Sequence, residues 1–157
     1  MNTKRWFIGG LLFLSSINLS LSDSHIDVVG MMNDICDHSA MTTPPFGVST
    51  YPIIYQSTAE YLNTIICCGA TAVTYRNQIY LSEFIDLNTV KGQSVLYHEL
   101  VHVVQNYNNL TAKNCNDWVR NEIQAYELQR QWAVKHGFDL EIEKSIEKSK
   151  RFCVDEE

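Results

Sequence analysis

The pentapeptide His98-Glu99-Leu100-Val101-His102 constrains this chain more than any other feature. Its flanks contain neither Gly nor Pro on either side and predict a continuous helix. Residues four apart on a helix share one face, about 6 Å apart along the axis, so both imidazoles can reach one ion at about 2.0–2.1 Å. Glu99 projects beside that face, where it can hold a water on the ion. The pattern predicts His98 and His102 as zinc ligands and Glu99 as a general base.

The residues around the motif favour a metal site over a structural alternative, in which each histidine is a core residue satisfied by a backbone carbonyl. Two His and a Glu on a buried helix are costly to desolvate without a partner, and a metal ion supplies one. We therefore expect one Zn²⁺ per chain. The helix is predicted to be apolar nearly all round because seven residues beside or within the motif are apolar or aromatic: Val95, Leu96, Tyr97, Leu100, Val101, Val103 and Val104.

A second helix, predicted over residues 116–132, supplies a third ligand. Asn116 or Asp117 is its expected N-cap, and His136-Gly137 its C-terminal stop. A catalytic zinc needs three protein ligands and an open fourth position, and Glu122 is the predicted third ligand. The alternative is a solvated carboxylate. Glu127 lies on another face, whereas Glu122 belongs to a stripe that is predicted to pack inward: Trp118, Glu122, Ala125, Gln129 and Trp132.

HELVH followed by a helical Glu122, with Ala125 three residues on, resembles the gluzincin clan of zinc metallopeptidases, the thermolysin-like group. The spacing from the second His to the Glu matches thermolysin's pattern, and the resemblance covers roughly residues 70–132. It implies His98, His102 and Glu122 as zinc ligands and Glu99 as base. It also implies an α+β, small single-domain zincin-like fold, with a short mainly antiparallel sheet, an active-site helix and a third-ligand helix.

Two parts of the gluzincin pattern have no assigned counterpart in this sequence. Members of that clan often place an Asp after the ligand Glu to orient the first His, and here Ala125-Tyr126 occupies that region. The downstream His or Tyr that stabilises the oxyanion is also unassigned. Its candidates, each with a packing role as the alternative, are Tyr97, Tyr107, Tyr126 and His136.

Residues 1–22 are predicted to be a secretory signal peptide. Two basic residues precede an apolar run from Trp6 to Leu14, and Ser20-Leu21-Ser22 offers small residues for cleavage before Asp23. The run is short for a retained membrane anchor. We therefore expect an exported chain, periplasmic or secreted, without stable membrane insertion after cleavage.

Residues 23–157, the part after the predicted leader, suffice for one domain. Losing the leader's two basic residues changes the formal net charge from −6 to −8. This acidity argues against nucleic acid or an anionic membrane as a partner. A peptide or protein substrate is the expected partner, and the sequence favours no particular oligomeric state.

Five cysteines suggest disulfides if the chain is exported: Cys36, Cys67, Cys68, Cys115 and Cys153. Two bridges and one thiol are the simplest arrangement. The adjacent pair is expected to bind separate partners. A link from Cys115 to Cys153, or to one of that pair, would brace the ligand helix.

A small sheet is predicted before the HELVH helix. Ile53-Ile54-Tyr55 is a strand candidate, and residues 57–60 form a capping-box pattern that opens a short helix through about Ile66. Residues 71–75 and 78–81, joined by Arg76-Asn77, predict a β-hairpin. In zincins, the strand just before the active-site helix commonly forms the upper edge of the cleft and pairs with substrate. Strand 78–81 has that place in sequence, with a purely structural role as the alternative.

The remaining segments are less constrained by the sequence. Residues 23–43 are mixed in pattern, residues 84–92 read as a loop, and Ser94 is the expected N-cap of the HELVH helix. Residues 139–152 predict an amphipathic helix with a solvated Lys/Glu face. Its inward residues are expected to be Ile142, Ile146 and Phe152.

These observations favour a zinc metallopeptidase in which Glu99 takes a proton from water and passes it to the leaving amine. Two alternatives from other classes remain. One is a catalytically inactive, zinc-stabilised exported binding or regulatory domain. The other is a disulfide-stabilised exported domain without metal, in which HELVH is structural.

Overall fold

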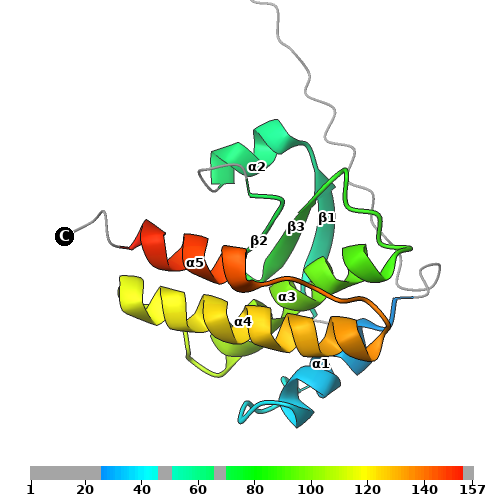
Figure 1. Ribbon diagram of the computed structural model, residues 1–157, viewed down its shortest axis with the longest axis horizontal. Helices are drawn as coiled ribbons and strands as arrows, with labels where there is room; N and C mark the ends of the chain where they lie inside the picture. The colour runs from blue at the N-terminus through cyan, green and yellow to red at the C-terminus, as the bar shows by residue number, and fades with distance from the viewer. Residues whose placement is uncertain (1–25, 46–50, 66–69, 154–157) are drawn as a thin grey trace, which may run out of the picture.

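In the computed structural model of the chain, residues 26–45, 51–65 and 70–153 are described. These residues form an α+β domain, as predicted, in which five helices accompany one small sheet (Figure 1). The predicted leader, residues 1–22, lies outside the described residues. The elements in chain order are α1 (Val28–Asp37), β1 (Ile53–Ser57), α2 (Ala59–Ile65), β2 (Ala72–Tyr75), β3 (Gln78–Ser82), α3 (Val90–Tyr107), α4 (Cys115–Lys135) and α5 (Glu143–Phe152).

The sheet has the strand order β1-β3-β2 and is mixed. The predicted hairpin is confirmed: β2 pairs antiparallel with β3, and Arg76 and Asn77 make the turn with φ of 51° and 60°, as a two-residue type I′ turn requires. β1 pairs parallel with β3, a pairing that the expectation of a mainly antiparallel sheet did not include. Parallel pairing is possible here because α2 and β2 carry the chain across between the two strands.

The central position of β3 overturns the prediction that strand 78–81 forms an open edge of the cleft. β3 is hydrogen-bonded to a strand on each side and has no free edge for a substrate. β2 is the edge strand beside α3 instead. Side chains alternate along a strand, so Thr74, which is paired with Ile79, faces α3 together with the buried Ile79 and Leu81. Tyr80 faces the other side, where its ring contacts Tyr61 of α2.

Helix α3 begins at Val90 with Thr89 as its N-cap, so the prediction of Ser94 as N-cap is wrong. The Thr89 hydroxyl accepts a hydrogen bond from the Gly92 amide at 3.0 Å. Gly92, assigned from sequence to the preceding loop, lies in the first turn. A Cβ there would meet the Asp86 carbonyl oxygen at 2.0 Å, so glycine lets the loop pack directly against the start of α3.

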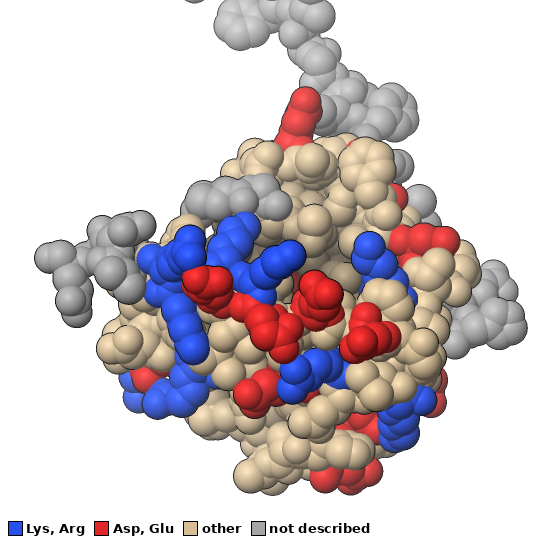
Figure 2. All heavy atoms as spheres, in the orientation of Figure 1, with Lys and Arg blue, Asp and Glu red and all other residues tan. Residues whose placement is uncertain are grey.

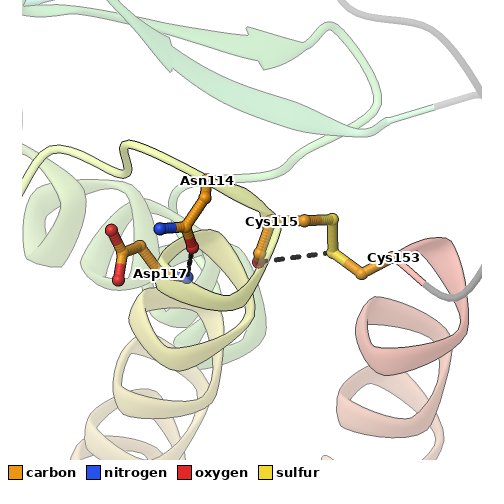
Figure 3. The surroundings of a disulfide bond; sticks show 4 residues. All are labelled: Asn114, Cys115, Asp117 and Cys153. Carbon is orange, nitrogen blue, oxygen red and sulfur yellow. Dashed lines mark hydrogen bonds between the residues drawn. A yellow bond between two sulfur atoms is a disulfide. The ribbon is translucent and has the colours of Figure 1, made fainter. Parts of the chain in front are cut away.

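Helix α4 begins with Asn114 as its N-cap, and the prediction of Asn116 or Asp117 is therefore wrong. The Asp117 amide donates to the Asn114 side chain at 2.8 Å (Figure 3), which places Asp117 in the acidic first turn rather than at the cap. The predicted stop is confirmed: His136 is the C-cap, and Gly137 has a φ of 80°, a backbone conformation that glycine adopts without strain.

The core lies between α3 and the elements around it. Helix α1, which the mixed pattern of residues 23–43 did not predict, packs on α3. Its inward face consists of four buried side chains: Val28, Met31, Met32 and Ile35. Apolar positions at this spacing define one face of a helix. The segment also contains four residues of low helix propensity, Gly30, Asn33, Asp34 and Asp37, so its sequence did not indicate a helix.

Helix α5 lies along α4 and is joined to it by a disulfide between Cys115 and Cys153 (Figure 3). One of the two pairings considered for Cys115 is thus confirmed. Cys36 forms no disulfide within the described residues, and the adjacent cysteines 67 and 68 lie outside them. Ile142 is buried as predicted, but Phe152 is 45% exposed and contacts the Trp118 ring, so its inward prediction is wrong.

The face of the molecule that carries α4 and α5 shows basic and acidic side chains interspersed (Figure 2). The Lys and Glu residues of α5 are exposed, which confirms the solvated face predicted from their alternation. Within residues 26–45, 51–65 and 70–153, no helix has both the length and the apolar character needed to cross a membrane.

Candidate metal centre

Three side chains predicted as ligands converge from two helices. His98 and His102 lie one turn apart on α3, and Glu122 reaches them from α4. The two imidazole Nε2 atoms are 3.1 Å apart. The Glu122 carboxylate oxygens lie 3.5 Å from His98 Nε2 and 3.2 Å from His102 Nε2. We call His98, His102 and Glu122 the metal cluster; among the described residues they form the group that could hold a metal ion.

The separations within the metal cluster match the coordination sphere of zinc. Ligand atoms at the corners of a tetrahedron, each 2.0–2.1 Å from its centre, lie about 3.3–3.4 Å from one another. The three observed separations run from 3.1 to 3.5 Å, with Glu122 Oε2 facing His98 and Glu122 Oε1 facing His102. Two imidazole nitrogens and one carboxylate oxygen are also a donor set that zinc accepts. The residues therefore fit a divalent ion with nitrogen preference.

Close packing of α3 against α4 brings the three ligands together. Ala125, three residues after Glu122, is fully buried in the core cluster with Leu100 and Val101 of α3. A larger side chain at position 125 would hold the helices further apart, since interhelical distance depends on the residues at the contact. The inward stripe predicted for α4 is confirmed by the burial of Ala125, Gln129 and Trp132, while Glu127 is exposed.

Each histidine of the metal cluster is held by a buried glutamine that the sequence analysis did not assign to the site. His98 Nδ1 lies 3.1 Å from Gln129 Oε1, and His102 Nδ1 lies 2.8 Å from Gln105 Oε1. Gln129 thus occupies the orienting place that had no counterpart in sequence, two turns after Glu122 rather than one. The signal available was its position on the inward stripe of α4; Gln105 had the weaker signal of lying three residues after His102.

Glu99, the predicted base, lies beside the metal cluster and is not one of its ligands. Its side chain is almost fully buried. The Thr74 hydroxyl, on strand β2, lies 2.8 Å from Glu99 Oε2 and 3.0 Å from the Glu99 carbonyl oxygen. A hydrogen bond to an ionised carboxylate is stronger than one between neutral groups, so the edge strand fixes the orientation of this carboxylate. Nothing in the sequence linked Thr74 to Glu99.

The charges within the metal cluster are coupled. Burial lowers the pKa of His102, but the hydrogen bond and negative charge of Glu122 outweigh burial and raise that pKa to about 9. Burial raises the pKa of Glu122, but hydrogen bonds from His102 and His98 hold it well below its ordinary value. A proton and a divalent ion therefore compete for the same atoms, and binding of an ion must release the proton.

Of the four residues considered for oxyanion stabilisation, only Tyr126 lies at the site. Its ring contacts the His98 ring at 4.4 Å between centroids. Burial, followed by the nearby Glu122, raises the pKa of Tyr126, while a hydrogen bond with the Ser145 side chain on α5 opposes that rise. Tyr97 is instead directed to Asp34, Tyr107 is exposed, and His136 stacks on Trp132.

The fold and its three converging ligands define a small α+β domain with a candidate mononuclear metal centre. The chain belongs to the family described as Domain of unknown function (DUF6647), which matches residues 55–150. The match spans more than half of the chain and includes the hairpin, the metal cluster and most of α5. No curated protein and no solved structure matches the chain.

Proposed function

We propose that this protein is an exported zinc metallopeptidase. The observation that carries the proposal is the convergence of His98, His102 and Glu122 on one point, with Glu99 buried next to it on the same helix. The spacing of these four residues resembles that of gluzincins. The Cys115–Cys153 disulfide is compatible with export, because disulfides persist in oxidising compartments.

Zinc is the ion that best suits the metal cluster. Magnesium and calcium prefer ligand sets made of oxygen atoms, whereas two of the three donors here are imidazole nitrogens. Three protein ligands leave one tetrahedral position free for water or substrate, the arrangement of catalytic rather than structural zinc sites. Purified protein is therefore expected to contain one zinc per chain.

The proposed reaction is hydrolysis of a peptide bond. When bound, zinc would lower the pKa of water towards 7 and polarise the substrate carbonyl. Glu99 would accept the proton of the attacking water and deliver it to the leaving amine. Thr74 would keep the Glu99 carboxylate in the orientation required for both transfers, since it donates a hydrogen bond to one of its oxygens.

A digest of a peptide library with and without o-phenanthroline tests the proposal. Cleavage that disappears with the chelator and returns with added zinc is the expected result. Glu99→Gln should keep zinc stoichiometric and lower turnover by about 10²–10⁴-fold, the usual contribution of a general acid–base group. An active Glu99→Gln variant would show that another residue is the base.

The second candidate is a zinc-stabilised binding or regulatory domain without turnover. The observation that favours it is the engagement of Tyr126, the one oxyanion candidate near the metal cluster, with Ser145. A zinc-loaded protein that cleaves no member of the library would support this candidate. A purified protein without zinc would instead support a structural role for HELVH.

A further inference from the structure

We infer that Gln105 and Gln129 are positioning residues that hold both ligand histidines in the tautomer with the proton on Nδ1. The Nε2 lone pairs of His98 and His102 are then both directed at the bound ion. The inference rests on the metal site of the proposed function and does not depend on peptidase activity. It follows from two chains of hydrogen bonds, each of which connects a backbone carbonyl oxygen, through a glutamine, to Nδ1 of one histidine.

The first chain runs from Lys91 to His98. The Ser94 hydroxyl donates its proton to the Lys91 carbonyl oxygen at 2.7 Å. A hydroxyl has one proton, so towards Gln129 the Ser94 oxygen can only accept, and the Gln129 atom 3.3 Å from it must be the amide nitrogen. The Gln129 carbonyl oxygen then faces His98 Nδ1 at 3.1 Å. An oxygen without a proton requires a donor, so Nδ1 carries the hydrogen.

The second chain runs from Asn121 to His102. The Gln105 amide nitrogen lies 3.1 Å from the Asn121 carbonyl oxygen, which can only accept. Its second proton is donated to Gln124 Oε1 at 2.9 Å. With both protons used, the Gln105 carbonyl oxygen faces His102 Nδ1 at 2.8 Å. His102 must therefore carry a hydrogen on Nδ1, and an ion bound at Nε2 leaves this as the only hydrogen on the ring nitrogens.

The two chains start on different helices but have the same result. Both imidazoles present Nε2 to the metal cluster, where the two nitrogen atoms are 3.1 Å apart. Gln105 belongs to α3 and bonds to two residues that flank Glu122 on α4, so it also fixes the third ligand relative to His102. Both glutamines are buried, which shields these bonds from competition with water.

The glutamines also set the charge at the ion. Histidine ligands commonly donate their second N–H to a carboxylate, a carbonyl or water, and this partner raises ligand basicity and fixes the ring. A carboxamide fixes the ring without adding a negative charge. With glutamines as the partners of both histidines, Glu122 is the one carboxylate that balances the charge of the ion at these positions. The ion therefore keeps more of its positive charge than it would if carboxylates took the places of Gln105 and Gln129.

Long-range ¹H–¹⁵N NMR of the zinc-loaded wild-type protein tests the tautomers directly. We expect Nε2 of both histidines to show the shift of a metal-bound nitrogen, with Nδ1 protonated. Ligation through Nδ1 of either histidine would overturn the inference. This measurement needs no variant and therefore does not depend on whether substitutions fold. A wild-type protein that binds no zinc would refute the metal site itself.

Zinc affinity, measured by competition with a chromophoric chelator, tests the glutamines. Gln129→Met and Gln105→Met should each weaken zinc binding by about 10–100-fold, the usual cost of losing an orienting partner. Gln131→Met, on the exposed face of α4, is the matched control and should bind zinc like the wild type. Gln129→Glu keeps an acceptor towards His98 and should restore binding.

The outcomes separate two kinds of failure. If wild type and both Met variants bind zinc equally, the glutamines do not position the ligands, although the metal site stands. If Gln129→Glu is as weak as Gln129→Met, burial of the side chain rather than its acceptor oxygen matters, and the inference fails. Circular dichroism of each variant identifies any that has lost the fold.

Discussion

Helix α3 carries two polar clusters on adjacent residues, and they differ in how their charges are balanced. The first is the metal cluster, which includes His98. The second, which we call the Asp34 cluster, consists of Asp34, Tyr97 and Lys135. Its central carboxylate accepts hydrogen bonds from the Tyr97 hydroxyl at 2.8 Å and from the Lys135 ammonium at 2.7 Å.

The Asp34 cluster contains a side-chain cation, Lys135, whereas the charge of Glu122 in the metal cluster is balanced by a proton on His102 that an ion can displace. Lys135 neutralises Asp34 within the fold. In the metal cluster, the protons on the far side of each imidazole are committed to glutamines, and once the proton shared with Glu122 is released, the near side presents lone pairs and a carboxylate. A cluster that supplies its own counter-ion stabilises a fold, while one that directs acceptors at a common point is suited to a ligand.

The largest effect that we expect is a loss of stability without a loss of zinc affinity, on removal of the disulfide. Replacing both Cys115 and Cys153 with Ser opens a loop of 38 residues in sequence separation and should lower the free energy of unfolding by about 4 kcal/mol. Two of the ligands lie on α3, and Glu122 lies two turns after Cys115 on α4. Zinc affinity should therefore remain within about 3-fold of the wild type, which corresponds to less than the 1.4 kcal/mol of a 10-fold change. Urea denaturation and chelator competition measure the two quantities.

A parallel loss of zinc affinity in the cysteine double variant would contradict this separation. It would show that the disulfide holds Glu122 in place rather than simply restraining the unfolded chain. Each single Cys→Ser variant should behave like the double variant, since either substitution opens the same loop.

The next largest effect is a loss of zinc affinity when the carboxylate of the metal cluster, but not that of the Asp34 cluster, is neutralised. Glu122→Gln should weaken zinc binding more than about 100-fold, because it removes a ligand charge and even orienting partners contribute 10–100-fold. Glu127→Gln, on the exposed face of the same helix, and Asp34→Asn should leave zinc affinity unchanged. Equal affinity of Glu122→Gln and the wild type would remove Glu122 from the ligand set.

The ligands of the metal cluster could be predicted because their geometry is local. Two histidines four residues apart share a helix face whatever the helix packs against, and the inward stripe of α4 selects Glu122 over Glu127. The hairpin was equally local, since a two-residue turn determines its pairing. Helix α1 was missed because it is short and rich in residues of low helix propensity, Gly, Asn and Asp.

The partners of the ligands could not be predicted because they depend on tertiary structure. Gln129 meets His98 across 31 residues, and Thr74 meets Glu99 across 25. These contacts exist only because α4 crosses α3 closely at Ala125 and because β2, rather than β3, is the edge strand that packs beside α3. Sequence order suggested β3, and the parallel pairing of β1 with β3 reversed that expectation.

A smaller effect is expected at Thr74. Thr74→Val keeps the shape of the side chain and removes its hydrogen bond to Glu99, and should lower kcat by about 10-fold, equivalent to about 1.4 kcal/mol. KM and zinc affinity should not change, because within the described part of the chain the Thr74 hydroxyl bonds to Glu99 and not to a residue of the metal cluster. Thr74→Ser retains the hydroxyl and should restore kcat. A Val variant with wild-type kcat would show that Glu99 needs no orientation by β2.

The smallest effect lies in the Asp34 cluster and depends on pH. Burial raises the pKa of Asp34, but hydrogen bonds from Lys135 and Tyr97 outweigh it and hold the pKa below its ordinary value of 3.8. A carboxylate whose pKa is depressed by folding adds stability above its unfolded pKa and loses it as the pH falls through the folded pKa. Asp34→Asn should therefore be less stable than the wild type at pH 6, by about 1 kcal/mol because Lys135 is largely exposed.

The difference between Asp34→Asn and the wild type should shrink as the pH falls below about 3.8, because the Asp34 carboxyl gains its proton first in the unfolded chain and only at lower pH in the folded protein. Asn keeps an acceptor for the Tyr97 hydroxyl, so the variant isolates the charge of Asp34 from its hydrogen bond. Thermal unfolding of both proteins over this pH range measures the difference. A stability difference between the two proteins that is constant from pH 6 to pH 3 would show that the charge of Asp34 does not stabilise the fold. The Asp34 cluster would then no longer serve as the structural counterpart of the metal cluster.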